Sequence, residues 1–164
     1  VPMVKSAQDA SDAVAATRYA PQGNRGVGLA RAQGYGPKFT EYLDWQKDSI
    51  IVIVQIEHKD AISNLEEILA VPGVDGFIIG PYDLSCSMGM PGEFENSEFK
   101  DAMNYILSKG LSMGCPAGLH IVEPDLLRLK QSISEGFRFI AYSVDVRMLD
   151  VSARKGIDSI KGVN

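Results

Sequence analysis

Three polar side chains follow directly on strongly apolar stretches of this sequence. Gln55 and Glu57 come at the end of the run IIVIV (residues 50–54). Asp83 comes just after the run VDGFIIG (residues 74–80). Because side chains two residues apart in a strand project to the same face, Gln55 and Glu57 face the same side. A carboxylate is almost never fully buried unless it is paired or bound to a metal. Glu57 at the end of a buried strand therefore predicts a cationic partner.

The two carboxylates predict a site for a divalent metal ion. Asp83 follows Glu57 by about one strand–helix unit, so the two stand at the ends of neighbouring strands. Two ionised carboxylates that lie close together repel unless a cation lies between them. Oxygen ligands suit a hard ion such as Mg²⁺ or Mn²⁺, which keeps positions for water and for the oxygens of a substrate. The residues alone leave open the alternative that Glu57 and Asp83 are solvated or helix-capping loop residues.

The segment GPYDLS (residues 80–85) has features of an anion-binding turn. Gly80 allows the backbone to approach a ligand closely, and Pro81 fixes its own φ angle. The amides of Tyr82 and Asp83 are then expected to point at an anion, as backbone nests do. An ordinary turn is the alternative interpretation. Gly80 and Pro81 are therefore predicted to lie near the site.

Strand and helix patterns alternate five times along the chain, in segments whose apolar residues follow the strand or helix period. We expect strands at 1–4, 49–57, 74–80, 111–121 and 137–145. We expect helices from Ser6 to before Pro21 and at 38–48, 60–73, 97–110 (capped by Ser97), 123–136 and 146–160. The segments 21–37 and 81–92 are expected to be loops.

The strands are apolar without polar alternation, which is typical of a parallel sheet covered by helices. Such an α/β pattern fits either a doubly wound open sheet or a (β/α)8 TIM-barrel. A complete barrel takes about 250 residues, so 164 residues match about five of its units. We interpret residues 1–164 as a single domain. The chain opens on an apolar segment without an initiator Met, and we expect it to be a piece of a longer chain.

The amino-acid composition argues against two classes of binding partner, nucleic acids and membranes. The net charge is −5 and no basic stripe is present, which argues against nucleic acid. No apolar run approaches the roughly 20 residues of a membrane span.

The two cysteines, Cys86 and Cys115, do not form a disulfide framework, so we expect a cytoplasmic protein. We expect structural roles for His58 and His120.

Taken together, several segments resemble the HpcH/HpaI aldolase family, the class II metal-dependent pyruvate aldolases that act on 4-hydroxy-2-oxo acids. The matching segments run in family order and cover nearly the whole chain. They are VPMV (1–4), AVAATRYAPQGNRGVGLARA (13–32), VQIE (54–57), NLEEILAVPGVDGFIIGPYDLSCSMG (64–89) and FIAYSVDVRML (139–149).

The resemblance implies a role for each candidate residue. Glu57 and Asp83 would bind the metal ion (Mg²⁺, Mn²⁺ or Co²⁺), Gln55 would contact the substrate, and Tyr82 would offer its backbone to the pyruvate carboxylate. Arg25 would lie near the site. Two positions depart from the family: Tyr82 stands where Ala or Ser is usual, and Ser143 stands where related sequences often have Gly.

The activity implied is the reversible cleavage of 4-hydroxy-2-oxo acids to pyruvate, or a similar 2-oxo acid, and an aldehyde through a metal-stabilised enolate. The catalytic His base and an Arg of the family belong to barrel strands that precede the counterpart of Val1. The chain would then be the C-terminal five-eighths of the barrel, with strands 1–3 absent.

Two alternatives stay open. One is a citrate-lyase-like enzyme of the same superfamily that acts on an acyl-CoA. The other is a non-catalytic barrel fragment or assembly subunit. The resemblance also implies a homo-oligomer, with dimers assembled into a hexamer.

Overall fold

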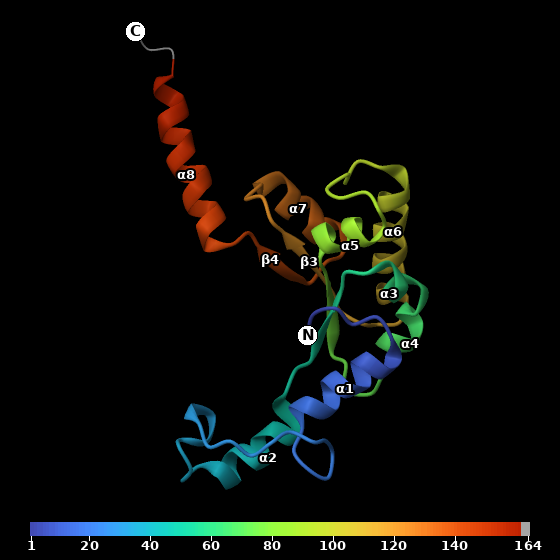
Figure 1. Cartoon of the computed structure of the whole chain (residues 1–164), viewed down its shortest axis with the longest axis vertical. Coiled ribbons are helices and arrows are strands. Elements are labelled where there is room, and N and C mark those ends of the chain that lie inside the picture. Colours follow the sequence, from blue (N-terminus) through green and yellow to red (C-terminus); the bar gives the residue numbers. More distant parts are fainter. Residues whose placement is uncertain (162–164) are drawn as a thin grey trace.

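The computed structural model describes residues 1–161, which fold around a parallel sheet of four strands (Figure 1). Its strands are β1 (Ile53–Ile56), β2 (Gly76–Ile79), β3 (Ala117–Ile121) and β4 (Phe139–Tyr142). Each strand pairs in parallel with the next strand along the chain, in the order β1-β2-β3-β4. A doubly wound sheet reverses its strand order at a switch point, whereas a barrel does not. The observed order is therefore that of a barrel wall.

Helices follow each strand, as the sequence predicts. They are α1 (Ala7–Thr17), the 3₁₀ helix η1 (Arg31–Gln33), α2 (Phe39–Ser49), α3 (Lys59–Ser63), α4 (Leu65–Leu69), α5 (Pro81–Ser87), α6 (Ser97–Ser112), α7 (Leu126–Glu135) and α8 (Asp145–Ile160). α1 packs against α4, and α4 packs against α6. Figure 1 shows α8 extending away from the sheet, while α2 and the loop before it lie at the opposite end of the molecule.

The two faces of the sheet differ in burial. One face packs against the helices, and its side chains are buried together with those of α4, α5 and α6. This core contains Val54, Ile56, Phe77, Ile79, Leu119 and Ile121 from the strands, and Leu65, Ile68, Leu84, Phe99 and Ile106 from the helices. The opposite face carries Gln55 and Ile78, which are half-buried, and Phe139, which is exposed. Gln55 therefore projects from the face that the helices leave open.

The first predicted strand, residues 1–4, does not form a regular strand. Val1 nevertheless lies beside β1. Its amino group donates to the Ile53 carbonyl at 2.7 Å, and the Gln55 amide donates to the Val1 carbonyl at 2.8 Å. These two bonds are the pattern of a parallel ladder. The extended backbone beside β1 stops at Met3, because Met3 has a left-handed φ of 56°.

Three sequence-based boundaries are wrong. Residues 81–92 were predicted as a loop, but α5 begins at Pro81 because proline is well suited to the first helical position. The helix predicted at 60–73 is divided into α3 and α4 at Asn64. The cap of α6 is Asn96 rather than Ser97, since the Asn96 side chain accepts the amide of Glu98.

The last two strands are also shorter than predicted. α6 continues to Ser112 and takes up Leu111, so β3 starts only at Ala117. β4 ends at Tyr142 because Ser143 adopts a left-handed backbone with φ of 60°. The hydroxyl of Ser143 donates to the Val122 carbonyl at 2.8 Å, which holds this conformation. Left-handed backbone favours glycine, so Ser143 holds a conformation that a side chain rarely adopts.

Candidate metal and substrate site

Glu57 is buried at the carboxyl end of β1, with 4% of its surface exposed. Its two carboxylate oxygens accept hydrogen bonds from neutral donors. The Met3 amide donates to Oε1 at 2.8 Å, and the Gln55 side-chain amide donates to Oε2 at 2.6 Å. Among the ion pairs of residues 1–161, none includes Glu57. The carboxylate is thus buried and oriented without a protein cation, which is the state expected of a metal ligand.

The Met3 contact is a feature that the sequence did not reveal. Met3 has φ of 56°, a conformation that a side chain such as methionine rarely adopts. Residues held in such conformations cluster at functional sites. The pairing of Val1 with β1 brings the Met3 amide to Glu57, and no local pattern predicts this contact because the two residues are far apart in the chain.

Gly80 lies directly against Gln55 and Glu57. A Cβ atom at Gly80 would stand 2.7 Å from Oε2 of Glu57 and 2.8 Å from Nε2 of Gln55, which is closer than real Cβ contacts allow. The end of β2 therefore approaches the carboxylate as only glycine permits. The structure brings together Gln55, Glu57 and Gly80, which the sequence placed at the ends of adjacent strands.

Asp83 follows Gly80 by three residues and lies in the first turn of α5, where it is exposed. Three residues are less than one helical turn, so the Asp83 backbone lies within about 5.4 Å of Gly80 along the helix axis. Pro81 and Tyr82 occupy the first positions of the same turn. The first amide groups of a helix have no acceptor within the helix and remain available to a ligand. The segment thus presents a carboxylate and free amides in the helical turn that directly follows Gly80.

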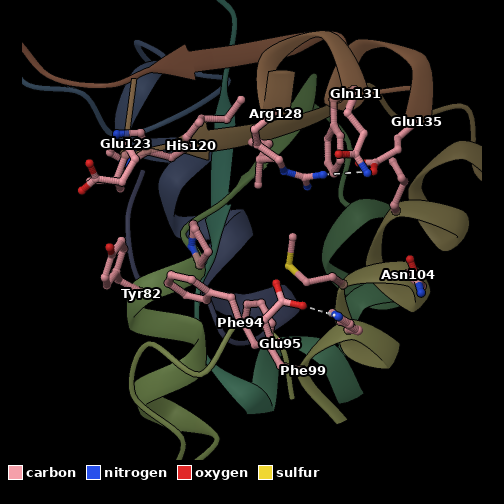
Figure 2. A pocket seen from close by; sticks show the side chains of 18 residues that line it. Tyr82, Phe94, Glu95, Phe99, Asn104, His120, Glu123, Arg128, Gln131 and Glu135 are labelled. Carbon is pink, nitrogen blue, oxygen red and sulfur yellow. Dashed lines mark hydrogen bonds and ion pairs between the residues drawn. The ribbon is translucent and has the colours of Figure 1, made fainter. Parts of the chain in front are cut away.

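The Tyr82 side chain points away from the backbone amides toward a cavity. Its ring meets the edge of Phe94 with centroids 4.9 Å apart, and 43% of the residue is exposed. Figure 2 shows Tyr82 at one side of this cavity, with His120 and Glu123 nearby. His120 is half-buried at the end of β3. No local sequence pattern indicates the cavity, because its walls come from several segments between residues 81 and 137.

Arg25 lies apart from this group. Its guanidinium group stands over the rings of Tyr19 and Tyr42 at 4.9 and 5.4 Å, and it donates to the Tyr42 hydroxyl at 3.0 Å. These contacts hold the loop before η1 to α2. The structure does not bring Arg25 to Glu57, so a role for it near the site stays a prediction.

The donor set fits a divalent metal ion. Glu57 would supply a buried carboxylate without a cationic neighbour, and Asp83, in the first turn after the adjacent strand, would supply a second carboxylate. Within residues 1–161, no group of three or more His, Cys, Asp or Glu side chains is placed so that it could hold a metal ion. Mg²⁺ typically uses one or two carboxylates and fills its other positions with water and substrate oxygens. Two carboxylates are therefore enough for an ion of this kind.

A parallel sheet wound in one direction, with carboxylates at the carboxyl ends of its strands, is the arrangement of (β/α)8 barrels. The chain belongs to the HpcH/HpaI aldolase/citrate lyase family, whose family model matches residues 1–150.

The chain is similar to proteins named as aldolases. It is 39% identical over 150 residues to the 2-keto-3-deoxy-L-rhamnonate aldolase of Escherichia coli (strain K12), covering 90% of this chain and 55% of the relative. It is 40% identical over 154 residues to the hydroxypyruvate/pyruvate aldolase of Sagittula stellata, covering 93% of this chain and 60% of the relative.

A solved structure shows the same fold. It is that of an HpcH/HpaI aldolase/citrate lyase family protein from Burkholderia cenocepacia J2315, with a TM-score of 0.89 and 31% identity over 98% of this chain and 63% of the neighbour. The chain thus spans between about half and two thirds of the length of the proteins it matches. No helix of residues 1–161 is long and apolar enough to cross a membrane.

Proposed function

We propose that this chain carries the metal-binding part of a class II aldolase, which cleaves 4-hydroxy-2-oxo acids to pyruvate, or a similar 2-oxo acid, and an aldehyde. The observation that carries the proposal is Glu57, a buried carboxylate held by Met3, Gln55 and Gly80 without a protein cation. The names of the relatives at 39–40% identity support an aldolase that handles a 2-oxo acid.

Glu57 and Asp83 would hold the ion, which is Mg²⁺, Mn²⁺ or Co²⁺. When bound, the ion supplies a Lewis acid that draws electrons from the substrate carbonyl. The two carboxylates neutralise its charge and leave other positions for the substrate oxygens. Gln55 fixes the orientation of the Glu57 carboxylate through the 2.6 Å hydrogen bond, and its position on the open face of the sheet also allows contact with substrate.

The residues of α5 would bind the substrate carboxylate. The amides of Tyr82 and Asp83 lie in the first turn of this helix, where they have no helical acceptor. Partial positive charge at a helix start favours an anion. Pro81 fixes the entry into the turn, and Gly80 keeps it close to Glu57. We assign the His base and the Arg that handle the proton and the aldehyde oxygen to segments outside these 164 residues.

We further propose that the protein is a cytoplasmic homo-oligomer in which dimers assemble into a hexamer. The support for association lies in α8, which carries no buried residue and exposes Val146, Leu149, Ile157 and Ile160. Such an apolar stripe on a projecting helix favours contact with another chain.

Metal binding can be tested on the chain itself. Electron paramagnetic resonance of free Mn²⁺ during titration is expected to show one bound ion per chain. Glu57→Gln is expected to weaken binding at least tenfold and Asp83→Asn by a similar factor. Glu67→Gln serves as the matched control, because Glu67 is exposed on α4. Equal Mn²⁺ affinity in Glu57→Gln and in the unmodified chain would contradict the proposed site.

The reaction is tested with the longest natural protein that contains this chain. Pyruvate release from 4-hydroxy-2-oxo acids is expected with Mg²⁺ or Mn²⁺ and is expected to stop with EDTA. Glu67→Gln again serves as the control and is expected to keep full activity. Pyruvate release that persists in EDTA or in Glu57→Ala would overturn the metal-dependent mechanism.

A further inference from the structure

Met3 holds a strained backbone conformation at the point where the chain meets Glu57. Its φ of 56° is one that a residue with a side chain rarely adopts. Such a conformation costs free energy and persists only where the surrounding contacts over-determine it. Burial of the Met3 side chain offsets little of this cost, because 47% of the residue is exposed. The contacts of its backbone and of its neighbours must therefore hold it.

The departure from the extended path gives the Met3 amide a different acceptor. Val1 pairs with β1 as in a parallel ladder, through hydrogen bonds to Ile53 and Gln55. Continued for two more residues, this ladder would place the Met3 amide on the Gln55 carbonyl. The Met3 amide instead donates to Oε1 of Glu57 at 2.8 Å. The strained backbone thus directs a ladder donor to a buried carboxylate.

Contacts on the other side of Met3 fix the same stretch of chain. Val4 is buried in the core, with 1% of its surface exposed. The Lys5 amide donates to the Asp9 carboxylate at 2.9 Å, and the Lys5 carbonyl accepts the side-chain amide of Asn64 at 2.9 Å. Residues 1–5, which we call the clamp segment, are therefore held on both sides of Met3.

Asn64 serves the clamp segment rather than the helix that it precedes. It lies where α3 ends and α4 begins, but its side chain does not cap α4. The side chain is half-buried and donates to the Lys5 carbonyl, 59 positions away in the chain. Its contact therefore ties the start of α4 to the backbone that reaches Glu57.

The hydrogen bonds to Glu57 leave room for an ion. A carboxylate has about four positions that accept a hydrogen bond or a metal ion. The Met3 amide occupies one on Oε1, and the Gln55 side chain occupies one on Oε2. Both donors are neutral, so they orient the carboxylate without cancelling its charge. Loss of a group that hydrogen-bonds to a metal ligand typically weakens metal binding by about 10–100-fold.

We propose that the clamp segment positions the metal ligand Glu57. The Met3 amide orients the carboxylate, and Asn64 holds Met3 in place through Lys5. The proposal rests on the proposed function, in which Glu57 binds the ion. Met3 and Asn64 are positioning residues, because both act through Glu57 and neither contacts the ion or the substrate.

Removal of one backbone donor tests the role of Met3. In the 164-residue chain, Met3 is replaced by its α-hydroxy acid analogue, so that an ester oxygen takes the place of the amide N–H. Mn²⁺ affinity, measured by electron paramagnetic resonance of the free ion, is expected to fall about tenfold or more. Met3→Gly keeps the amide and adopts a left-handed φ without strain, so its Mn²⁺ affinity is expected to stay within about twofold.

The matched control is the same ester at Gln8. The Gln8 amide lies in the first turn of α1, where it has no acceptor within the helix, and the residue is exposed. This ester is expected to leave Mn²⁺ affinity unchanged. Urea denaturation of each variant separates positioning from folding, because a purely structural role would lower the free energy of unfolding and leave the Mn²⁺ affinity of the folded chain unchanged.

Asn64 is tested through its coupling to the Met3 amide. Asn64→Ala and Asn64→Asp both remove the donor to the Lys5 carbonyl, and each is expected to weaken Mn²⁺ binding several-fold. In the chain with the ester at Met3, the same substitutions are expected to have no further effect, because Asn64 acts through that amide. An equal loss with and without the ester would overturn the role of Asn64.

Nuclear magnetic resonance of the metal-free chain gives a second measurement. The Met3 amide proton is expected downfield of its random-coil position and is expected to move upfield in Asn64→Ala. A random-coil position in the unmodified chain would overturn the proposal, as would an unchanged Mn²⁺ affinity in the Met3 ester or an equal loss in the Gln8 ester. These three outcomes leave Glu57 as a metal ligand. Failure of the unmodified chain to bind Mn²⁺ would instead refute the proposed function, and this proposal with it.

Discussion

Gly80 is the residue whose substitution probes the candidate site most directly. A methyl group at this position would lie 2.7 Å from the Glu57 carboxylate and 2.8 Å from the Gln55 amide. Gly80→Ala must therefore displace one of these side chains. We expect Mn²⁺ affinity to fall at least tenfold and the free energy of unfolding to fall by about 1–3 kcal/mol, the usual cost of overpacking.

The measurements are Mn²⁺ titration and urea denaturation. Gly26→Ala is the matched control, because a Cβ at Gly26 would meet no atom within 4 Å. Mn²⁺ affinity that is unchanged in Gly80→Ala would show that the close approach of Gly80 to Glu57 has no role in metal binding.

The two cysteines are expected to differ in reactivity. Burial raises the pKa of the Cys115 thiol, and the nearby charge of Asp75 raises it further, whereas Cys86 is exposed on α5. Because the thiolate is the reactive form, iodoacetamide at pH 8 is expected to modify Cys86 first and Cys115 at least several times more slowly. Mass spectrometry of peptides over time measures both rates. Equal rates in the folded chain would contradict the assigned burial of Cys115.

At the scale of residues, the sequence predicts which groups form the candidate site but not how the structure holds them. Gln55, Glu57 and Asp83 follow from apolar runs and the two-residue period of a strand. The amide of Met3 is different, because its contact with Glu57 depends on a left-handed backbone and on pairing between distant segments. No propensity of methionine indicates such a conformation, so only the folded structure reveals it.

The start of α1 provides a test at the scale of an element. Ser6 accepts the Asp9 amide at 3.1 Å, and the Asp9 carboxylate accepts the Lys5 amide at 2.9 Å. The Lys5 amide, together with Ser6, holds the pKa of Asp9 below its usual range. A lowered pKa in the folded state means that ionised Asp9 stabilises the fold. This contribution is complete above the unfolded pKa of about 3.9 and is lost as the pH falls through the folded pKa.

Asp9→Asn is therefore expected to lower the free energy of unfolding at pH 7. The difference from the unmodified chain is expected to shrink as the pH falls below about 4. Urea denaturation at pH 7 and at several acidic values measures this trend. Asp12→Asn is the control, because Asp12 is exposed on the same helix. A destabilisation by Asp9→Asn that is the same at all pH values would contradict a role for the ionised carboxylate.

Local signals predicted the helices better than their exact ends. Ser6 caps α1 and Gly136 ends α7 as the pattern predicts, because these residues satisfy free backbone groups within their own segment. α5 was missed because proline, glycine and serine around it are also typical of loops. The helix forms because Leu84 is fully buried against the sheet, which is a tertiary contact.

At the scale of the whole molecule, the pattern of strands and helices alone could not distinguish a barrel from a doubly wound sheet, whereas the resemblance to the HpcH/HpaI aldolase family predicted the barrel, and this prediction is confirmed. Both architectures have parallel strands buried without polar alternation, so both produce the same apolar runs. The distinction lies in strand order, which pairs β1 to β4 consecutively. Residues such as Phe139 then face away from the helices and are exposed, although their sequence pattern is that of a buried strand.

The projecting helix α8 leads to the last prediction, which concerns association of chains. Val146, Leu149, Ile157 and Ile160 are each more than half exposed. Their spacing of three, eight and three residues places them along one side of the helix. Covering such a stripe removes apolar surface from water and stabilises an assembly by roughly 25 cal/mol for each Å² buried. We therefore expect the unmodified chain to elute as a dimer or larger species in size-exclusion chromatography with light scattering.

Leu149→Glu places a charge in the middle of this stripe and is expected to shift the mass toward that of one chain, 17.8 kDa. Lys155→Gln changes the net charge by the same amount on the opposite side of α8, and it is expected to keep the larger mass. This control separates loss of the apolar contact from general charge repulsion. A single-chain mass for the unmodified protein at high concentration would refute the association. Equal masses for Leu149→Glu and the unmodified protein would place the contact elsewhere than on α8.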